Sequence, residues 1–295
     1  MNNQKWLDYS TLAHFMRCPR MHYWRMKHHL TTTGIARDFG KAIHIALATW
    51  NRTKDPTLSI TAFKNAMSSI TQEDSKRNLT TGVDGLNAYF ARWKDEEYKT
   101  IDVEVGFAID VHSKHGDFVF IGKIDRIVDS PTLGVGIMEH KTTTIGGDSW
   151  LNRAEPNMQM DGYITALSTL YGKQPFGGVL DIIHFHEKPT QRHLAMRILK
   201  TKWDAQDWAR NISAWYDEIV VCDEEDFHPK NTDNCVPIIP GFSCEYTELC
   251  SMYPNPYGVE EIQIPGKYVV EPWHPYENRE IKGEMCETPK TPSYL

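Results

Sequence analysis

Two neighbouring apolar segments constrain the fold of this chain more than any other feature. Phe118–Val128 and Val135–Met138 flank a turn-forming stretch that contains Pro131 and Gly134. Alternating apolar and β-branched residues bounded by turn formers predict two antiparallel strands, so we expect a hairpin over Phe118–Thr142. Both faces of the expected hairpin are largely apolar, as in a strand that is covered on two sides.

Three of the charged residues in this apolar hairpin form a candidate group. Asp125 lies in the first strand, and Glu139 and Lys141 come at the end of the second. Side chains alternate along a strand, so Glu139 and Lys141 share one face while His140 points to the other. Charges in a covered strand cost free energy unless they are paired or bind a metal. The alternative, an ion pair on an exposed sheet edge, is common and contributes little.

The types of these residues suit hydrolysis of a phosphodiester. Two carboxylates with an open position suit a hard divalent cation such as Mg²⁺, which binds oxygen ligands and retains waters. A lysine two residues beyond the second carboxylate can orient or deprotonate a water molecule. Asp125, Glu139 and Lys141 are therefore the candidate catalytic residues.

The same residues carry a resemblance to a known family. The segment from Gly122 to Asp125, followed by Glu139-His140-Lys141, resembles the D…E-x-K core of the PD-(D/E)XK nuclease superfamily. The resemblance covers roughly residues 5–255, and residues 256–295 form an unmatched tail with weak β character at best.

Two further segments resemble RecB-like members of that superfamily and the small nucleases of CRISPR adaptation. Gln159 and Tyr163 lie four residues apart on an expected helix and resemble the Q-x-x-x-Y motif, whose residues contact DNA or support the lysine. His44 follows Gly40 by four residues and resembles the G-x-x-x-H segment, whose histidine binds the metal. Taken singly, a structural histidine or a core tyrosine would explain either segment.

The resemblance implies a set of roles. His44, Asp125 and Glu139, with the backbone carbonyl of His140, would hold Mg²⁺ or Mn²⁺, and an imidazole ligand suits Mn²⁺. Lys141 would position the attacking water. Glu104 would support the metal ligands or bind a second metal ion. The residues expected to contact DNA are Arg17, Arg20, Gln159 and Tyr163.

Four of the six cysteines match a second pattern of this family. Cys18 opens a C-P-R sequence like that of its iron–sulfur nucleases, and Cys244 and Cys250 have the family spacing C-x5-C. Gly241 stands where the family has another cysteine, so Cys235 would supply that ligand. This set implies a [4Fe–4S] cluster. Structural zinc is the alternative, although zinc sites normally use closely spaced cysteine pairs. Cys222 and Cys286 have no evident role.

The charge is unevenly distributed along the chain. The net charge is −7, but residues 223–295 carry 14 acidic and five basic residues, which leaves the remainder at +2. The first 30 residues hold five Lys or Arg, interleaved with aromatic residues, and a single acid, Asp8. Basic and aromatic side chains together suit contacts to single-stranded nucleic acid, while packing of the aromatics in a core is the alternative.

The order of expected elements predicts an α/β fold, in which a mixed central sheet is flanked by helices and carries an N-terminal helical layer and a C-terminal Cys-bearing segment. We expect one domain over residues 1–255, with a helical insertion at 55–100. The expected helices and strands are Thr11–Lys27 capped by Ser10 and broken at Pro19, a helix from Asp38 to Trp50, two helices in 56–99 separated at Gly82–Gly85, a strand over Ile101–Ile109, the hairpin, helix Pro156–Tyr171, strands Gly178–Phe185 and Leu194–Leu199, and helix Asp204–Val221.

These expectations combine into one functional hypothesis. The chain is expected to be a metal-dependent deoxyribonuclease, an exonuclease acting on single-stranded or duplex DNA ends in phage recombination, phage replication or CRISPR adaptation. A protein of recombination or CRISPR adaptation would be its partner. The alternative is a catalytically silent, DNA-end-binding iron–sulfur subunit of a repair complex. No apolar stretch predicts a membrane span or a signal peptide, so we expect the cytoplasm of a bacterial or phage-infected cell.

Overall fold

The computed structural model describes residues 5–144, 156–186, 192–235, 243–257, 259 and 261–273. Contacts between Cα atoms divide this chain into two compact units, each assembled from separate segments. Within the described residues, the first unit contains 5–33, 110–121 and 209–273. The second unit contains 34–109 and 122–208, and it includes most of the expected hairpin.

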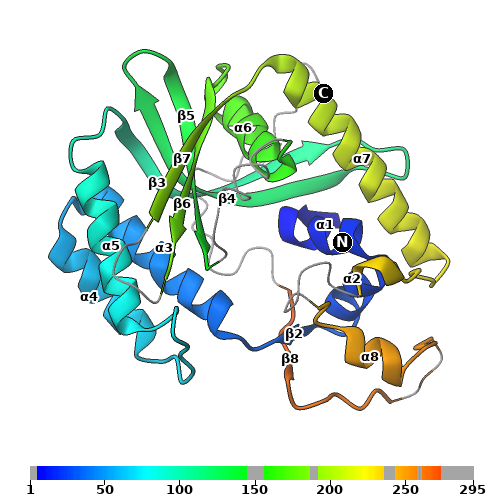
Figure 1. Ribbon diagram of the computed structural model, residues 1–295. Coiled ribbons are helices and arrows are strands. Elements are labelled where there is room, and N and C mark those ends of the chain that lie inside the picture. The colour runs from blue at the N-terminus through cyan, green and yellow to red at the C-terminus, as the bar shows by residue number, and fades with distance from the viewer. Residues whose placement is uncertain are drawn as a thin grey trace. The chain divides into compact units, whose positions relative to one another are not determined.

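A mixed six-stranded sheet forms the framework (Figure 1). The strand order is β1-β4-β5-β6-β7, with β3 also paired to β4. β4 runs parallel to β1 and antiparallel to β5, β5 runs parallel to β6, and β7 is antiparallel to β6. The α/β prediction with a mixed sheet is thus confirmed. The strands are β1 Lys5–Asp8, β3 Lys99–Val111, β4 Phe118–Ser130, β5 Gly134–Thr143, β6 Gly177–His184 and β7 Arg192–Leu199.

The predicted hairpin is present as β4 and β5, and its register is set close to the turn. Ser130 pairs with Gly134, and the antiparallel ladder continues to Arg126 opposite Met138. Gly134 has a φ of 82°, a left-handed conformation that glycine adopts without a steric penalty. The apolar runs bury as expected, since Ile124, Ile127 and Ile137 are all fully buried.

Helices cover both faces of β5 and β6 in the second unit. Tyr89 of α5 contacts His140 of β5, whereas Gln159 of α6 contacts Glu139, the preceding residue of the same strand. Because neighbouring residues of a strand point to opposite faces, α5 and α6 lie on opposite sides of the sheet. The helices of this unit are α3 Ile35–Thr53, α4 Pro56–Met67, α5 Leu79–Trp93 and α6 Met158–Tyr171.

The predicted position of the break between α4 and α5 was wrong. We predicted it at Gly82–Gly85, but both glycines lie inside α5, and the chain leaves the helix over residues 68–78 instead. A Cβ atom at Gly82 would lie 2.1 Å from the ring of Phe63, and one at Gly85 would lie 2.3 Å from the ring of Phe185. These glycines therefore allow close packing of a helix and do not end it.

The first unit contains α1 Tyr9–Arg17, α2 Pro19–Met26, most of α7 Lys202–Glu224 and α8 Thr247–Met252. The predicted break at Pro19 is confirmed, because α1 ends at Arg17 and α2 begins at Pro19. The N-cap of α1 is Asp8 and not Ser10: the carboxylate of Asp8 accepts a hydrogen bond from the Thr11 N–H at 2.7 Å.

A small antiparallel ladder in the first unit was not predicted. β2 Leu30–Thr32 pairs with β8 Tyr268–Val270, which lies in the segment where we expected weak β character at best. The rings of Tyr246 and Tyr268 stack beside this ladder with centroids 5.9 Å apart. Within the described residues, none of the helices is long and apolar enough to span a membrane.

Candidate active site

The end of β5 places Glu139 and Lys141 side by side on the face covered by α6. The Lys141 ammonium donates to Glu139 Oε1 at 2.7 Å and to Gln159 Oε1 at 2.8 Å. The amide of Gln159 also donates to Glu139 Oε1, at 2.9 Å. Asn157 caps α6 by accepting from two backbone N–H groups, so Gln159 lies in the first helical turn, facing the strand. The three side chains close a triangle of hydrogen bonds.

Asp125 is held by the backbone of the opposite strand. Its Oδ2 accepts a hydrogen bond from the His140 N–H at 2.9 Å. Its Oδ1 lies 3.3 Å from Nδ1 of His44 on α3. One turn before His44, Gly40 faces Thr142 of β5, since a Cβ at Gly40 would lie 3.4 Å from Thr142 Oγ1, an ordinary van der Waals contact.

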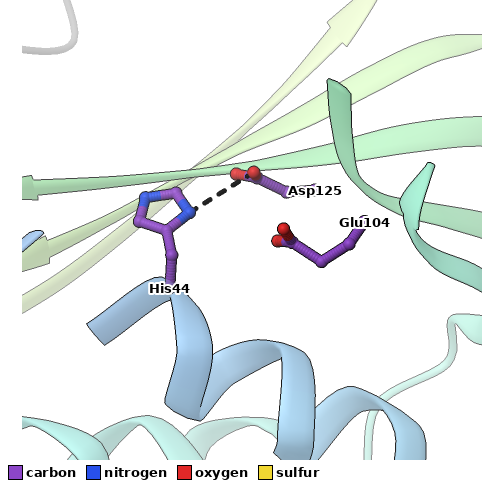
Figure 2. Close-up of side chains that lie close together, drawn as sticks. All are labelled: His44, Glu104 and Asp125. Carbon is purple, nitrogen blue, oxygen red and sulfur yellow. Dashed lines mark ion pairs between the residues drawn. The ribbon is translucent and has the colours of Figure 1, made fainter. Parts of the chain in front are cut away.

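Three potential metal ligands converge at this point. His44, Glu104 and Asp125 each offer a ligand atom, and these atoms all lie within 4.8 Å of one another (Figure 2). They come from α3, β3 and β4, so three elements separated in sequence meet here. We expected Glu104 only as a supporting group or a ligand of a second ion. The structure instead places it in the same group as His44 and Asp125.

The backbone at Glu104 is strained. Its φ is 59°, in the left-handed region that residues other than glycine rarely adopt inside a strand. Such a conformation costs about 1–3 kcal/mol and is typically found where a side chain must be aimed at a functional site. Glu104 also forms an ion pair with Lys123, which lies two residues before Asp125. No pattern in the sequence indicates this conformation.

The charges of the site act on one another. Burial opposes ionisation of Asp125, but the charge of His44 and contacts with His140 outweigh it and hold the pKa of Asp125 well below its usual range. For Glu139, burial and the charge of Asp125 outweigh Lys141 and raise the pKa. For His44, burial lowers the pKa, but the neighbouring Asp125 and Glu139 carboxylates outweigh burial, so the pKa of His44 is raised above its usual value. The site as a whole attracts positive charge.

One carboxylate oxygen at the site is unsatisfied. Glu139 is 3% exposed, and its Oε2 has no hydrogen-bond partner among the described residues. A buried, unpaired carboxylate oxygen costs free energy, which a cation would relieve. Carboxylate oxygens with one imidazole form a donor set that suits Mg²⁺ or Mn²⁺. The residues present therefore fit a divalent metal ion.

Comparison with known families identifies the fold around this site. The model of the PD-(D/E)XK nuclease superfamily matches residues 7–251, which is most of the chain. The protein belongs to the PD-(D/E)XK nuclease superfamily. The family suggested by Asp125, Glu139 and Lys141 is thus confirmed. No curated protein matches the sequence.

One solved structure supports the fold. A crystal structure described as a candidate exonuclease from Eubacterium rectale is similar to this chain with a TM-score of 0.52 and 12% identity, covering 89% of this chain and 92% of that one. A crystal structure of the protein SSO0001 matches with a TM-score of 0.37 and 11% identity over 83% of this chain and 90% of that one.

Tyr163, the second residue of the Q-x-x-x-Y motif, packs at the base of this PD-(D/E)XK site. It is 8% exposed, and its ring meets that of Phe107 edge to face with centroids 5.2 Å apart. A Cβ at Gly122 would lie 2.3 Å from Phe107 and 2.9 Å from Tyr163, so only glycine fits between β4 and these rings. Gln159, the first residue of the motif, hydrogen-bonds with both Glu139 and Lys141.

The two arginines expected at DNA differ in exposure. Arg17 is exposed, and its carbonyl oxygen accepts hydrogen bonds from Asn231 and Asn234. Arg20 is 3% exposed and donates through Nε to the His228 carbonyl at 2.9 Å. The structure thus places Arg20 in the interior of the first unit, while the DNA contacts of both arginines stay predictions.

Four cysteines gather in the first unit of this PD-(D/E)XK protein. Cys18 and Cys244 are buried, Cys235 and Cys250 are partly buried, and none is in a disulfide. Burial raises the pKa of Cys250, and the charges of Cys18 and Cys235 raise it further. Burial, Cys235 and Cys250 do the same to Cys244. Cys18 and Cys244 also belong to one buried cluster with Cys250 packed against it, and Cys235 acts on both Cys244 and Cys250, so the four thiols are neighbours.

Cys222 is not among the neighbours of this group. Burial raises the pKa of Cys222, and the further contributions come from acidic side chains and from no other cysteine. Cys286 lies outside the described residues.

Two sulfur atoms of the group accept hydrogen bonds. Cys18 Sγ accepts from the Asn231 backbone N–H at 3.2 Å, and Cys250 Sγ accepts from Trp24 Nε1 at 3.3 Å. Hydrogen bonds of this kind to sulfur are typical of thiolate ligands.

Proposed function

We propose that this protein is a metal-dependent deoxyribonuclease that removes nucleotides from DNA ends. The observation that supports the proposal is the site itself, where His44 pairs with Asp125, Lys141 pairs with Glu139, and one oxygen of Glu139 has no hydrogen-bond partner among the described residues. Membership of a nuclease superfamily supports the reaction class. The preference for ends and the biological setting, in phage recombination or CRISPR adaptation, are the finer part of the proposal.

We infer that the metal would be held by His44, Asp125 and Glu139, with the His140 carbonyl. His44, Asp125 and Glu104 offer ligand atoms within 4.8 Å of one another, a group that does not include Glu139, so Glu104 would be a further ligand. A divalent cation bound there would neutralise charge that develops on the phosphate. We prefer Mn²⁺ or Mg²⁺ because the protein donors are oxygen atoms and an imidazole.

Lys141 is the residue that would orient the attacking water. Its ammonium is fixed by Glu139 and Gln159, so its position does not depend on bound DNA. Gln159 in turn keeps Glu139 Oε1 occupied, which leaves Oε2 for the cation. Preorganisation of this kind avoids reorganising charges during the reaction. Arg17 and the other basic residues of the N-terminal helices would contact the DNA backbone.

An iron–sulfur cluster is the second part of the proposal. Cys18, Cys235, Cys244 and Cys250 would be its ligands. Zinc sites normally use closely spaced cysteine pairs, whereas Cys18 lies more than 200 residues before the other three, so a [4Fe–4S] cluster is preferred to structural zinc.

Cleavage of labelled DNA tests the proposed activity. End-labelled single-stranded and duplex DNA, together with closed circular DNA of the same sequence, would be incubated with Mn²⁺, with Mg²⁺ or with EDTA. We expect linear DNA to be shortened from an end with metal only, and circular DNA to remain closed. Cleavage of circular DNA would show an endonuclease, and no cleavage of any substrate would favour the silent DNA-binding subunit.

The variant Lys141→Ala distinguishes this activity from a contaminating nuclease. General-base or water-orienting groups typically contribute about 10²–10⁴-fold to turnover. Lys141→Ala, purified in the same way, should therefore lose that much activity. Activity equal to that of the wild type would assign the cleavage to another protein or the role to another residue.

A further inference from the structure

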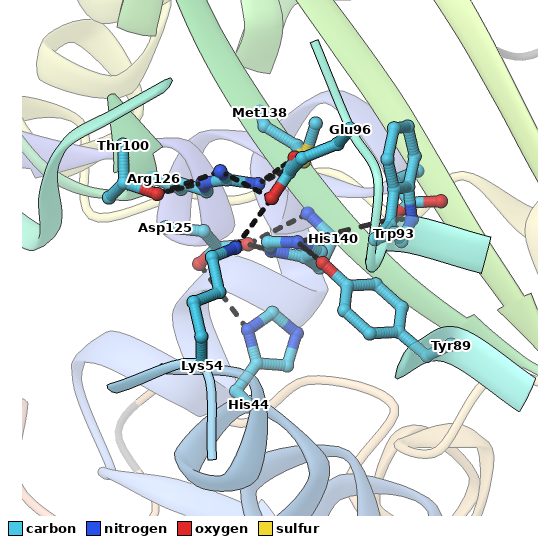
Figure 3. A network of polar contacts seen from close by, with 11 residues as sticks. His44, Lys54, Tyr89, Trp93, Glu96, Thr100, Asp125, Arg126, Met138 and His140 are labelled. Carbon is cyan, nitrogen blue, oxygen red and sulfur yellow. Dashed lines mark hydrogen bonds and ion pairs between the residues drawn. The ribbon is translucent and has the colours of Figure 1, made fainter. Parts of the chain in front are cut away.

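A buried polar network lies directly behind the candidate metal ligands, on the face of the sheet covered by α5 (Figure 3). Its members are Tyr89 and Trp93 of α5, His140 of β5 and Asp181 of β6. Tyr89 and Asp181 are fully buried, and His140 and Trp93 are 1% and 8% exposed. Polar groups buried to this degree are retained only where their hydrogen bonds are made.

His140 is the centre of this network. Its Nε2 forms a hydrogen bond with the Tyr89 hydroxyl at 3.0 Å. Its Nδ1 lies 3.6 Å from Asp125 Oδ2, and its backbone N–H donates to the same oxygen at 2.9 Å. His140 thus contacts a candidate metal ligand with both its backbone and its ring, and Figure 3 shows the ring between Tyr89 and Asp125.

Asp181 and Trp93 support His140 from the other side. Asp181 is the register partner of His140 in the parallel pair β5–β6. Its Oδ2 lies 4.0 Å from His140 Nε2 and accepts a hydrogen bond from Trp93 Nε1 at 3.0 Å. Tyr89 and Trp93 are four residues apart, so one face of α5 presents both groups.

We propose that Tyr89 and Trp93 are positioning residues for the metal site. They hold His140 and Asp181, and His140 in turn fixes the carboxylate of Asp125. Because His140 occupies Oδ2, the other oxygen of Asp125 is directed to His44 and Glu104, where the cation would bind. α5 belongs to the helical insertion, which thereby becomes part of the active site. The inference rests on the proposed metal-dependent function.

A purely structural role for Tyr89 would have different consequences. Tyr89 belongs to a large apolar cluster, so its ring contributes to packing whatever its hydroxyl does. The substitution Tyr89→Phe keeps the ring and removes the hydroxyl, with its hydrogen bond to His140. Tyr98 is another buried tyrosine of the same cluster, so Tyr98→Phe, which also keeps its ring, is the control for packing. Trp93→Phe, which removes the donor to Asp181, is a second and independent variant.

The decisive measurement is the affinity for Mn²⁺ in the absence of DNA, by titration calorimetry, with unfolding by guanidinium measured alongside. Residues that orient metal ligands typically contribute 10–100-fold to metal affinity. Tyr89→Phe should weaken Mn²⁺ binding by about that factor, and Trp93→Phe should weaken it by less. In cleavage assays, kcat for Tyr89→Phe should recover at saturating Mn²⁺, with the KM for DNA unchanged.

The outcomes separate this inference from the proposed function. If the wild type binds Mn²⁺ and both Tyr89→Phe and Trp93→Phe bind it equally well, the positioning role is wrong while the metal site stands. Equal weakening in Tyr98→Phe would also overturn it, because the effect would then be one of general packing. A wild-type protein that binds no Mn²⁺ would instead refute the proposed metal-dependent function.

Discussion

At the scale of single residues, Glu104 shows most clearly how geometry assigns a role. Its strained backbone and its position beside His44 and Asp125 support the proposed role of a metal ligand, whereas the sequence alone shows only an acidic residue in a strand. The sequence predicts a strand at Glu104 whether or not its side chain binds a metal. A left-handed residue within a strand depends on tertiary packing, so sequence periodicity cannot predict it.

The substitution Glu104→Gln tests this assignment. It keeps the size and backbone of the residue and removes its charge, so the affinity for Mn²⁺ should fall about tenfold or more, by analogy with the loss of one oxygen ligand. Calorimetry would measure the affinity, and circular dichroism would confirm the fold. Asp102→Asn, on the same strand, is the control and should bind Mn²⁺ like the wild type. Unchanged binding in Glu104→Gln would remove Glu104 from the ligand set.

The histidine His22 gives a pH dependence at the same scale. Burial lowers its pKa to about 4 from 6.5, and this outweighs the charge of Asp223, while His228 and His14 lower the pKa further. The unfolded chain therefore binds a proton between pH 6.5 and 4 that the folded protein does not. The titration of His22 therefore leaves the free energy of unfolding unchanged above pH 6.5 and lowers it as the pH falls from 6.5 to about 4.

The variant His22→Gln should reduce this dependence. A shift of that size corresponds to roughly 3 kcal/mol. Guanidinium unfolding of the wild type and the variant across this pH range would measure the difference in their free energies of unfolding. A variant whose stability falls with pH as steeply as that of the wild type would show that His22 is not the group responsible.

At the scale of elements, the strands were more predictable than the helical layer. Apolar alternation and turn residues placed β4, β5 and β6 within a few residues of their observed bounds, because burial on both faces leaves a strong local pattern. The glycines of α5 carried a misleading signal. Gly82 and Gly85 indicate a break when read locally, but they serve contacts with Phe63 and Phe185 that come from distant parts of the chain.

The substitution Gly82→Ala tests this role. In a helix, alanine is more favourable than glycine by about 1 kcal/mol, so a Gly→Ala substitution at an uncrowded helical site would stabilise the protein. At Gly82 the new Cβ would lie 2.1 Å from the Phe63 ring, so we expect a loss of about 1–3 kcal/mol from overpacking. Thermal and guanidinium unfolding would measure it, with Gly266→Ala as the control because nothing lies within 4 Å of its Cβ. A stabilised Gly82→Ala would show that Phe63 moves aside.

Asp181 and Tyr89 show what the sequence leaves out of the site. The motif residues were predictable because the chemistry of hydrolysis requires particular residue types at particular spacings. Their supports come from other elements and share no spacing with them. One signal was present, since Asp181 is an acid in the middle of the apolar strand β6, where a charge is retained only for a reason.

At the scale of the whole molecule, the cysteine group joins distant parts of the sequence within the first unit. Cys18 comes from α2's N-terminus, and the other three cysteines lie more than 200 residues later. A bound cluster would close this long loop and remove much of the freedom of the unfolded chain. Neither the spacing of the cysteines in the sequence nor their neighbourhood in the structure chooses between iron and zinc, so elemental analysis has to decide.

Anaerobic purification followed by elemental analysis tests the cluster. The protein should be brown and contain about four irons per chain, as expected for a [4Fe–4S] centre. Cys18→Ala should lose iron and become less stable, whereas Cys222→Ala should keep its iron because Cys222 lies apart from the group. Stoichiometric zinc without iron, in material prepared with iron present, would leave a zinc site in its place. Equal iron loss in both variants would refute the ligand assignment.

The most direct test of the central claim is a titration of Mn²⁺ into the DNA-free protein, comparing the wild type with Asp125→Ala and Lys141→Ala. Asp125 offers an oxygen at the point where three elements meet, whereas Lys141 carries a positive charge and cannot bind the cation. The account predicts binding in the wild type and in Lys141→Ala, and loss of binding in a folded Asp125→Ala. Unchanged affinity for Mn²⁺ in Asp125→Ala would contradict it.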